Sequence, residues 1–275
     1  MKISEVIVEE QLDEIDWKKP LATAAAAATI AGPWGYQSLT KHSEPTVATQ
    51  QIQQTQQTQQ LPQTVEPEVK QNPLDLVAPA SPRQIQKMLS RPMGKYLYEY
   101  ATKSGMQGAE LAQFMGQAAH ETQGFTHLRE TGGRLDFKKY EPVFKKDKRG
   151  KLILDPETNK PKDFNQLSKT LGNTQVGDGN RYIGRGFLHL TGRWNYDAAS
   201  RALGIDLVKH PELVETNPEV AAKVALWFWQ NRVQRRMRGT DYSDTPDVTR
   251  PINRGDAIER RHSMYRGFDQ ALDKK

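Results

Sequence analysis

Two glutamates nine residues apart, Glu121 and Glu130, are the side chains best suited to carry chemistry in this chain of 275 residues. Glu121 lies in a run from Gln107 to Thr122 in which apolar residues recur at intervals of three and four, the pattern of an amphipathic helix. Glu121 continues the apolar stripe, so burial should raise its pKa, as suits a general acid. The alternative is a glutamate in the last helical turn that faces solvent or pairs with an arginine.

The distance between the two glutamates depends on where this helix ends. A single helix running through both would hold them about 13–14 Å apart and half a turn out of phase. Gly124 offers a helix stop, which lets the chain turn back and bring Glu130 across a cleft. Two carboxyl groups about 6.5–9.5 Å apart, one protonated and one ionised, suit glycoside hydrolysis with inversion. The spacing permits this arrangement but does not by itself require it.

Several other kinds of chemistry are disfavoured. The chain has no cysteine, which excludes a disulfide framework, a thiolate zinc site and a cysteine nucleophile. His120 and Glu121 resemble the start of a zinc-protease helix, but the second histidine would have to stand at Gly124. Gly184 and Gly186 do not complete a phosphate-binding loop. We therefore expect neither a metal nor a cofactor.

Residues 187–191 alternate in the way expected of a β-strand. On a strand, successive side chains point to opposite faces. Leu188 and Leu190 would then face the core. The opposite face, lining a cleft, would carry Phe187, His189 and Thr191.

Further along, Asn217 and Pro218 mark the start of a helix, as a capping residue followed by proline at the first helical position. Its aromatic residues are interpreted as core. The arginines between residues 232 and 238 are interpreted as a solvated basic rim, because cations complement a helix C-terminus. Asn253 is expected in a turn and Arg261 in a charged helix, and neither indicates a function by itself.

Charge divides the chain into two regions. Residues 1–81 carry a net charge of −5 and residues 82–275 a net charge of +11, within a total of +6. A basic body indicates a polyanionic partner, either nucleic acid or an acidic wall or membrane surface. Residues 145–163 carry more lysines than acids and are interpreted as a surface hairpin around Asp155-Pro156.

The composition predicts three parts: a leader over residues 1–35, a disordered Gln/Pro-rich linker over residues 36–81, and a folded domain over residues 82–275. The apolar run at residues 21–32 is too short to span a bilayer, which needs about twenty residues. The acidic residues before it argue against a secretion signal. A small docking helix and plain disorder are preferred for the leader, and a weak secretion signal stays open.

Five segments of the body, in this order, resemble glycoside hydrolase family 19, which contains chitinases and phage or bacterial endolysins. The resemblance covers about residues 85–272. It implies a mainly α (α+β) fold: a lysozyme-like, two-lobed catalytic domain with a small β-hairpin region. The segments are AHETQGF (119–125), RYIGRGFLHLTGRWNY (181–196), RALGIDLVKHPELVETNPEVAAKVALWFW (201–229), INRG (252–255) and RRHSMYRGF (260–268).

The resemblance also implies roles for single residues. Glu121 matches the general acid and Glu130 the second catalytic carboxylate, with Glu141 as its substitute if the intervening loop folds differently. Arg261 matches the arginine that contacts the catalytic base. His189 stands where the family usually has glutamine, so a substrate hydrogen bond there is altered or depends on pH. The other matches are Thr191, which helps to hold the attacking water, Trp194, which stacks on a sugar ring, and the substrate-binding residues Asn195 and Asn253.

These features predict an inverting glycosidase, without cofactor or metal, that cuts β-1,4 bonds beside N-acetylglucosamine-type sugars. Peptidoglycan is the preferred polysaccharide, because a basic body suits an anionic wall and the family branch resembles phage endolysins. Chitin is the alternative. A non-catalytic wall-binding virion or surface protein is a further alternative, whereas nucleic-acid binding is disfavoured. We expect a monomer without a stable membrane span that acts on the bacterial cell wall, in the periplasm, outside the cell or on a virion.

Overall fold

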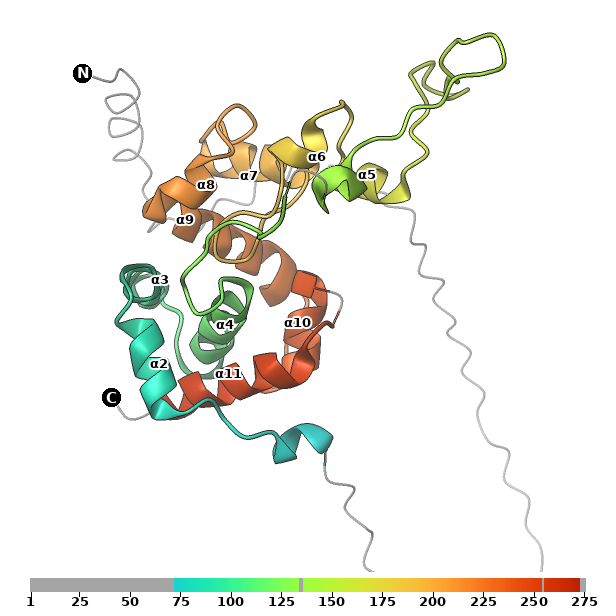
Figure 1. Ribbon diagram of the computed structural model, residues 1–275. Coiled ribbons are helices and arrows are strands. Elements are labelled where there is room, and N and C mark those ends of the chain that lie inside the picture. The colour runs from blue at the N-terminus through green and yellow to red at the C-terminus, as the bar shows by residue number, and fades with distance from the viewer. Residues whose placement is uncertain (1–71, 134–135, 254, 273–275) are drawn as a thin grey trace, which may run out of the picture. The chain divides into compact units, whose positions relative to one another are not determined.

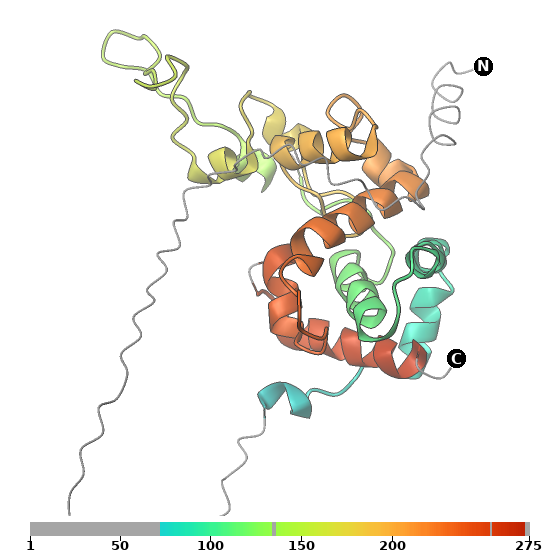
Figure 2. The same cartoon turned by 180° about the vertical axis from the view of Figure 1, so that it is seen from behind.

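Helix α4 (Gly108–Glu121) lies inside a ring of other helices, as the two opposite views in Figures 1 and 2 show. The computed structural model describes residues 72–133, 136–253 and 255–272. Within these residues the regular elements are helices, accompanied by isolated β-bridges. The mainly helical fold class is therefore confirmed. The predicted leader and most of the predicted linker lie outside the described residues.

The ring around α4 is formed by helices from both ends of the folded region. Before α4 come α2 and α3, and after it, much later in the sequence, come α9, α10 and α11. A short π-helical segment, η3, continues α9. The bounds are α2 (Pro82–Leu89), α3 (Pro92–Lys103), α9 (Pro218–Phe228), η3 (Trp229–Gln234), α10 (Thr245–Asn253) and α11 (Ile258–Leu272).

Burial of α4 explains why its sequence is so poor in charge. Its residues from Leu111 to Ala119 are all buried, including the polar side chains of Gln113 and Gln117. These two glutamines donate hydrogen bonds to Thr245 and Thr249 on α10, at 2.9 Å each. Each buried side-chain amide therefore has a hydrogen-bond acceptor. Helix α4 thus continues, as predicted, from the apolar stripe through to Glu121.

The chain reverses directly after α4, as the glycine stop predicts. The Thr122 hydroxyl accepts a hydrogen bond from the backbone N–H of Phe125 at 2.9 Å. Gly124 has a φ of +75°, a conformation that glycine adopts without steric cost. Glu130 therefore lies on a returning segment and not on a continuation of the helix.

A second hydrophobic cluster lies apart from the one around α4 and gives the predicted second lobe. It joins α9 to α7 (Arg193–Leu203) and the short α8 (Leu213–Thr216), and it includes Tyr182, which directly follows α6 (Asp178–Arg181). Asn217 caps α9 by accepting hydrogen bonds from the N–H groups of Glu219 and Val220, which confirms the predicted helix start. Helix α9 supplies buried residues to both clusters.

The predicted strand at residues 187–191 is wrong: the chain forms a tight turn there. Arg185 and Leu190 exchange backbone hydrogen bonds of 3.2 and 2.8 Å across it. Gly186 and His189 both have positive φ angles, +80° and +47°. The alternation is misleading because Phe187, expected to line a cleft, is fully buried in the α4 cluster, while Leu190 is buried in the second cluster. A turn between two cores hides apolar residues on both sides.

Residues 143–164, which we call the arm, project from the body beside α5 (Gln166–Leu171) in Figure 1. Bridges between Phe144 and Asp163, Lys146 and Leu152, and Leu154 and Pro161 hold it. The predicted hairpin is thus present as bridges without continuous strands. The arm closes at a narrow neck, where Phe164 N–H donates to the Val143 carbonyl at 2.8 Å.

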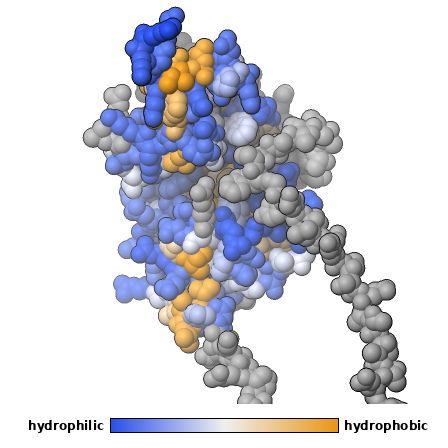
Figure 3. All heavy atoms as spheres, turned by 90° about the vertical axis from the view of Figure 1, so that its right-hand side faces the viewer, coloured by the Kyte–Doolittle hydropathy of each residue, from blue (hydrophilic) through white to orange (hydrophobic). Residues whose placement is uncertain are grey.

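The surface of the arm combines charge with apolar side chains. Leu152, Leu154 and Phe164 are all exposed. Hydrophobic atoms gather among hydrophilic ones at the upper end of the face in Figure 3, where the arm points to the viewer. Lys145 and Lys162 lie over the Phe164 ring, at 4.8 and 5.7 Å from its centre. Cation–π contacts of this kind order the base of the arm.

Residues 72–81, which the sequence analysis assigns to the linker, lie along α11. They include a short 3-10 helix, η1 (Pro73–Leu76). The N–H of Ala80 donates to the Ser263 carbonyl at 2.8 Å, and Arg266 donates to the carbonyl of Val77 at 2.9 Å. In the part of the chain that the structure describes, no helix has the length and apolar character needed to cross a bilayer.

Candidate active site

Glu121, the last residue of α4, is held by two basic side chains. Its Oε1 accepts a hydrogen bond from Arg261 at 2.6 Å, and its Oε2 lies 3.3 Å from Nδ1 of His189. Burial raises the pKa of this carboxyl, but hydrogen bonds from His189 and Arg261 and the Arg261 charge outweigh burial and lower it to about 2. The expectation of a raised pKa is therefore wrong for the free protein. The arginine-paired alternative describes Glu121 correctly.

Arg261 of α11 is completely buried, and its guanidinium joins α11 to α4 and to the turn that precedes α11. Besides Glu121, it donates to Gln117 Oε1 at 2.6 Å and to the Asp256 carbonyl at 2.9 Å. The resemblance implies contact with the second carboxylate, Glu130, but the structure places Arg261 on Glu121 instead. This expectation is wrong because α11 packs along α4 (Figure 1), where Arg261 donates its hydrogen bond to Glu121.

Glu130 has a different set of partners. Its Oε1 accepts from the Tyr140 hydroxyl at 2.9 Å, with Lys139 Nζ 3.7 Å away, and its Oε2 accepts from the Gly184 N–H at 3.2 Å. Both Tyr140 and Lys139 belong to η2 (Asp136–Tyr140). The Glu130 N–H donates to the Gly184 carbonyl at 2.8 Å. Glu130 is thus tied through both backbone and side chain to the start of the 185–190 turn.

Gly184 is the point at which the predicted residues converge. A Cβ atom built there would lie 3.2 Å from Glu130 Oε2, 3.2 Å from Thr191 Oγ1 and 3.1 Å from His189 Cβ. These distances are so short that a side chain at residue 184 would displace its neighbours. Since His189 also contacts Glu121, the turn links the two glutamates. Thr191 donates to the His189 carbonyl at 2.8 Å.

The other predicted binding residues lie farther along the same surface or away from it. Asn195 donates to the Thr191 carbonyl at 2.7 Å and accepts from Arg232 at 3.1 Å. Trp194 is 58% exposed and borders a pocket of about 360 Å³ that Lys169 and Arg193 also line. Asn253 is exposed at the end of α10, and no contact joins its side chain to the two glutamates.

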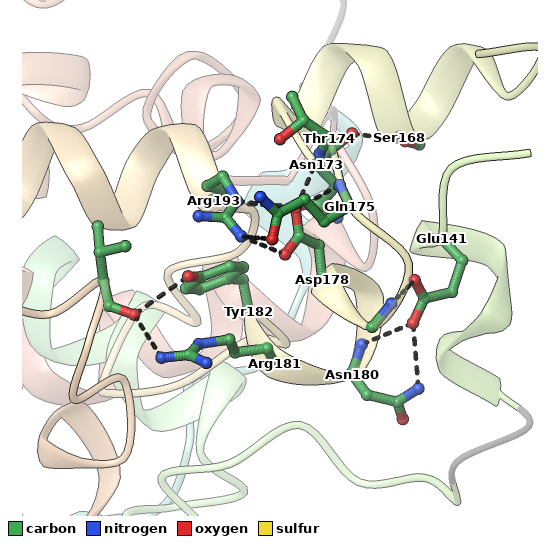
Figure 4. A network of polar contacts seen from close by, with 12 residues as sticks. Glu141, Ser168, Asn173, Thr174, Gln175, Asp178, Asn180, Arg181, Tyr182 and Arg193 are labelled. Atoms are coloured by element: carbon green, nitrogen blue, oxygen red, sulfur yellow. Dashed lines mark hydrogen bonds and ion pairs between the residues drawn. The ribbon is translucent and has the colours of Figure 1, made fainter. Parts of the chain in front are cut away.

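A polar network behind the site fixes α6 and α7, as Figure 4 shows. Asp178 accepts two hydrogen bonds from Arg193, at 2.8 and 2.6 Å, and backbone bonds from Thr174 and Gln175. Burial raises the pKa of Asp178, but these bonds outweigh it and lower the pKa. Because α6 precedes Gly184 and α7 follows Thr191, the network holds both ends of the segment that carries the turn.

Glu141, the substitute for the second carboxylate, belongs to this network. Its carboxylate accepts from the N–H groups of Gly177 and Asn180 and from the Asn180 side chain, at 2.7–3.2 Å. These bonds hold the first turn of α6. Glu130, and not Glu141, is therefore the carboxylate at Gly184.

Sequence reasoning missed three residues of the site: Tyr140, Lys139 and Gln117. Tyr140 and Lys139 stand in a short 3-10 helix without periodicity, so no pattern marks them. Gln117 stands in the apolar stripe of α4, and a buried glutamine there could have indicated a polar partner. Among the described residues, no group of three or more His, Asp or Glu side chains is placed to hold a metal ion.

Comparison with known proteins identifies the family. Residues 98–242, just over half of the chain, match the model of glycoside hydrolase family 19, described as chitinase class I. The chain belongs to glycoside hydrolase family 19. Both Glu121 and Glu130 lie within the residues that the family 19 model matches, as does the 185–190 turn, whereas Asn253 and Arg261 lie beyond them.

Relatives within family 19 come from bacteria and plants. A glycosyl hydrolase family 19 domain-containing protein of Haemophilus influenzae is 32% identical over 167 residues, which are 57% of this chain and 77% of the relative. An endochitinase of Arabidopsis thaliana is 47% identical over 125 residues, 46% of this chain and 37% of the relative. Chitinase 8 of Oryza sativa subsp. japonica is 37% identical over 120 residues, 44% of this chain.

The similarity to the plant proteins is confined to part of each. The chain spans about a third of the length of rice chitinases 8 and 2, 34% and 30% respectively. Among solved structures, chitinase C from Streptomyces griseus aligns with 70% of this chain and 92% of its own, at 22% identity and a TM-score of 0.45.

Proposed function

We propose that the protein is an inverting glycoside hydrolase that cuts β-1,4 bonds in polysaccharides containing N-acetylglucosamine. The observation that carries this proposal is a pair of glutamates in unlike surroundings, linked through the 185–190 turn. Glu121 is paired with Arg261 and His189, whereas Glu130 accepts hydrogen bonds from Tyr140 and Gly184. Two carboxyl groups in different environments can serve as acid and base of one reaction.

In this mechanism Glu130 is the general base. It takes a proton from a water that the Thr191 hydroxyl also holds, and the water oxygen attacks the anomeric carbon from the face opposite the leaving group. Glu121 gives a proton to the glycosidic oxygen as the bond from the anomeric carbon to that oxygen breaks. The hydroxyl left on the anomeric carbon is then inverted in configuration.

Peptidoglycan is the substrate that we propose. Two features support it: the net charge of +11 over residues 82–275, and the arm, where residues 145–163 carry seven Lys and Arg against four Asp and Glu. Peptide stems give peptidoglycan negative charge, which a basic enzyme attracts, whereas chitin is uncharged. Chitin is the second candidate, because rice and Arabidopsis relatives are named chitinases or endochitinases.

The test compares both polymers with the full chain. Peptidoglycan sacculi and chitin would be incubated in parallel, with release of soluble fragments measured over time. Fragments from sacculi, with the new reducing end first appearing as the α-anomer in NMR spectra, are the expected result. Release from chitin alone would replace the proposed substrate by the alternative. A first-formed β-anomer would contradict inversion, and binding without release from either polymer would contradict hydrolysis.

Tyr140→Phe tests the environment of Glu130. The change removes one hydroxyl and with it the 2.9 Å hydrogen bond to Oε1, while the ring can keep its stack on Phe137. We expect kcat to fall about tenfold with little change in KM, since a positioning bond worth about 1.5 kcal/mol is lost at the base. Tyr100→Phe is the matched control and should leave kcat unchanged, because the Tyr100 ring on α3 likewise stacks on a neighbouring ring, that of Tyr96. An unchanged kcat in Tyr140→Phe would contradict this role.

A further inference from the structure

His189 has one ring nitrogen paired and the other unpaired. Nδ1 lies 3.3 Å from Glu121 Oε2, with the two side chains 20% and 12% exposed. Nε2 is buried and has no hydrogen-bond partner. Buried polar atoms normally have partners, so an unpaired nitrogen beside a carboxylate calls for a functional explanation.

The backbone of His189 has a conformation that is unfavourable for a residue with a side chain. His189 has a φ of +47°, a region that few residues other than glycine adopt and that is found at functional sites. On either side of it, Leu188 is buried in the α4 cluster and Leu190 in the second cluster. The backbone at His189 therefore cannot move away from Glu121 without disturbing both cores.

Protonation of Glu121 is the unresolved step of the proposed reaction. Its partners lower its pKa to about 2, so the free protein carries a carboxylate there at neutral pH, although the leaving sugar needs a proton. Arg261, on Oε1, does not release a proton in proteins. His189, on Oε2, can carry and release one in the neutral range.

We propose that Glu121 and His189 hold one acid proton between them and that His189 supplies it to Glu121 when the glycosidic bond breaks. The inference rests on the proposed function. In the competent resting form, His189 is an imidazolium that donates Nδ1–H to the Glu121 carboxylate. His189 acts through Glu121 and is thus a positioning and proton-supplying residue.

The protons balance over one turnover. The Nδ1–H bond of His189 breaks as an Oε2–H bond forms on Glu121, and Glu121 passes this proton to the glycosidic oxygen. Glu121 is again a carboxylate and His189 is a neutral imidazole. Glu130 has meanwhile taken one proton from water and releases it to solvent, while His189 takes one from solvent, so the net reaction consumes only water.

The unpaired Nε2 fits this cycle. An imidazolium has N–H groups at both nitrogens, and the one at Nε2 has no acceptor in the protein. A bound glycan offers hydroxyl and acetamido oxygens that could accept it. Binding of the glycan and protonation of His189 would then favour each other, because linked equilibria are reciprocal.

Other charged or titratable side chains lie close to Glu121 and His189. The titratable and charged side chains around the pair are Arg261 on α11, Glu130 on the returning segment, Lys139 on η2, and His120 on α4, whose pKa burial and Arg261 lower to about 4.

The test is the pH dependence of kcat/KM for the wild type and His189→Gln, on whichever polymer the protein hydrolyses. Without His189, only Glu121 can hold the proton, and Arg261 keeps its affinity for protons low. We expect the alkaline limb to move to lower pH by about one unit or more. Coincident alkaline limbs would overturn the inference.

Two further variants keep the result interpretable. His210→Gln removes a histidine that lies 3.2 Å from Glu212, a similar pair that is exposed, and should leave the profile unchanged. His189→Asn suits the positive φ better, because asparagine is tolerated in that region. It should show the same shift as His189→Gln if the proton, and not the backbone, is responsible.

A measurement on the free protein separates this inference from the proposed function. In ¹⁵N spectra of the histidine rings between about pH 5 and 8, both ring nitrogens of His189 should carry protons at the acidic end of the range, and the signals should change in Glu121→Gln. If the wild type hydrolyses neither polymer, the proposed function fails, but these spectra still show whether His189 carries the acid proton. A His189 ring with a proton on only one nitrogen throughout this range would overturn the inference.

Discussion

Replacing Glu121 by glutamine should leave a folded protein that has lost nearly all hydrolysis. The amide has the shape of the carboxyl group, and its oxygen can still accept the hydrogen bond from Arg261. It cannot take a proton from His189 and pass it to the leaving sugar. A positioned general acid contributes about 10²–10⁴-fold to rate, so we expect kcat to fall by that factor while KM changes little.

The control should be a glutamate that also lies on a helix but is exposed to solvent. Glu99→Gln on α3 removes an exposed carboxylate that lies 3.9 Å from Lys95, and it should leave kcat unchanged. Circular dichroism and binding of an N-acetylglucosamine oligomer would verify that Glu121→Gln retains its fold and its glycan site. Near-normal hydrolysis by a correctly folded Glu121→Gln would contradict its role as the acid.

Replacing Arg261 by methionine should produce the largest loss of stability. Methionine keeps an unbranched apolar stem, but it leaves the buried Glu121 carboxylate without its 2.6 Å partner and breaks the bonds to Gln117 and Asp256. Removing one member of a buried ion pair costs about 3–5 kcal/mol. Urea unfolding at neutral pH would measure this loss. Arg250→Met, which removes an exposed arginine paired with Asp247, should cost less than about 1 kcal/mol.

The stability loss in Arg261→Met should depend on pH in a defined direction. Glu121 has a folded pKa of about 2, below its ordinary value of 4.5, so its ion pair stabilises the fold above about pH 4.5. That contribution disappears as the pH falls toward 2, because the carboxyl becomes protonated. The difference between wild type and Arg261→Met should shrink over this window. A difference that stays constant would show that lost packing, and not charge, is responsible.

The parts of the fold that follow from local pattern could be predicted from the sequence. The apolar stripe of α4, the glycine stop at Gly124 and the Asn217 cap each depend on residues close together in the chain. Glu121 and Glu130 could be selected as candidate catalytic residues for the same reason, since Glu121 lies on that stripe and Glu130 follows the glycine stop. Such features can be predicted without knowing which parts of the protein pack against them.

The remaining features depend on partners distant in sequence. The alternation at residues 187–191 indicates a strand, yet two hydrophobic cores bury both sides of a turn there. The pKa of Glu121 was predicted in the wrong direction because Arg261, 140 residues away, completes its surroundings. Tyr140 gives no signal before η2 is seen to face Glu130. The family was identified correctly from the sequence, but the electrostatics of the site required the tertiary contacts.

The neck of the arm has a consequence for how this protein can be altered. Val143 and Phe164 are joined by a 2.8 Å backbone hydrogen bond, and the bridges farther out pair residues of the arm with one another. A loop whose two ends already meet costs little entropy to lengthen, shorten or exchange. Residues 145–162 thus form an insertion site, where we expect that a foreign peptide or targeting module can be grafted while Glu121 and Glu130 keep their positions.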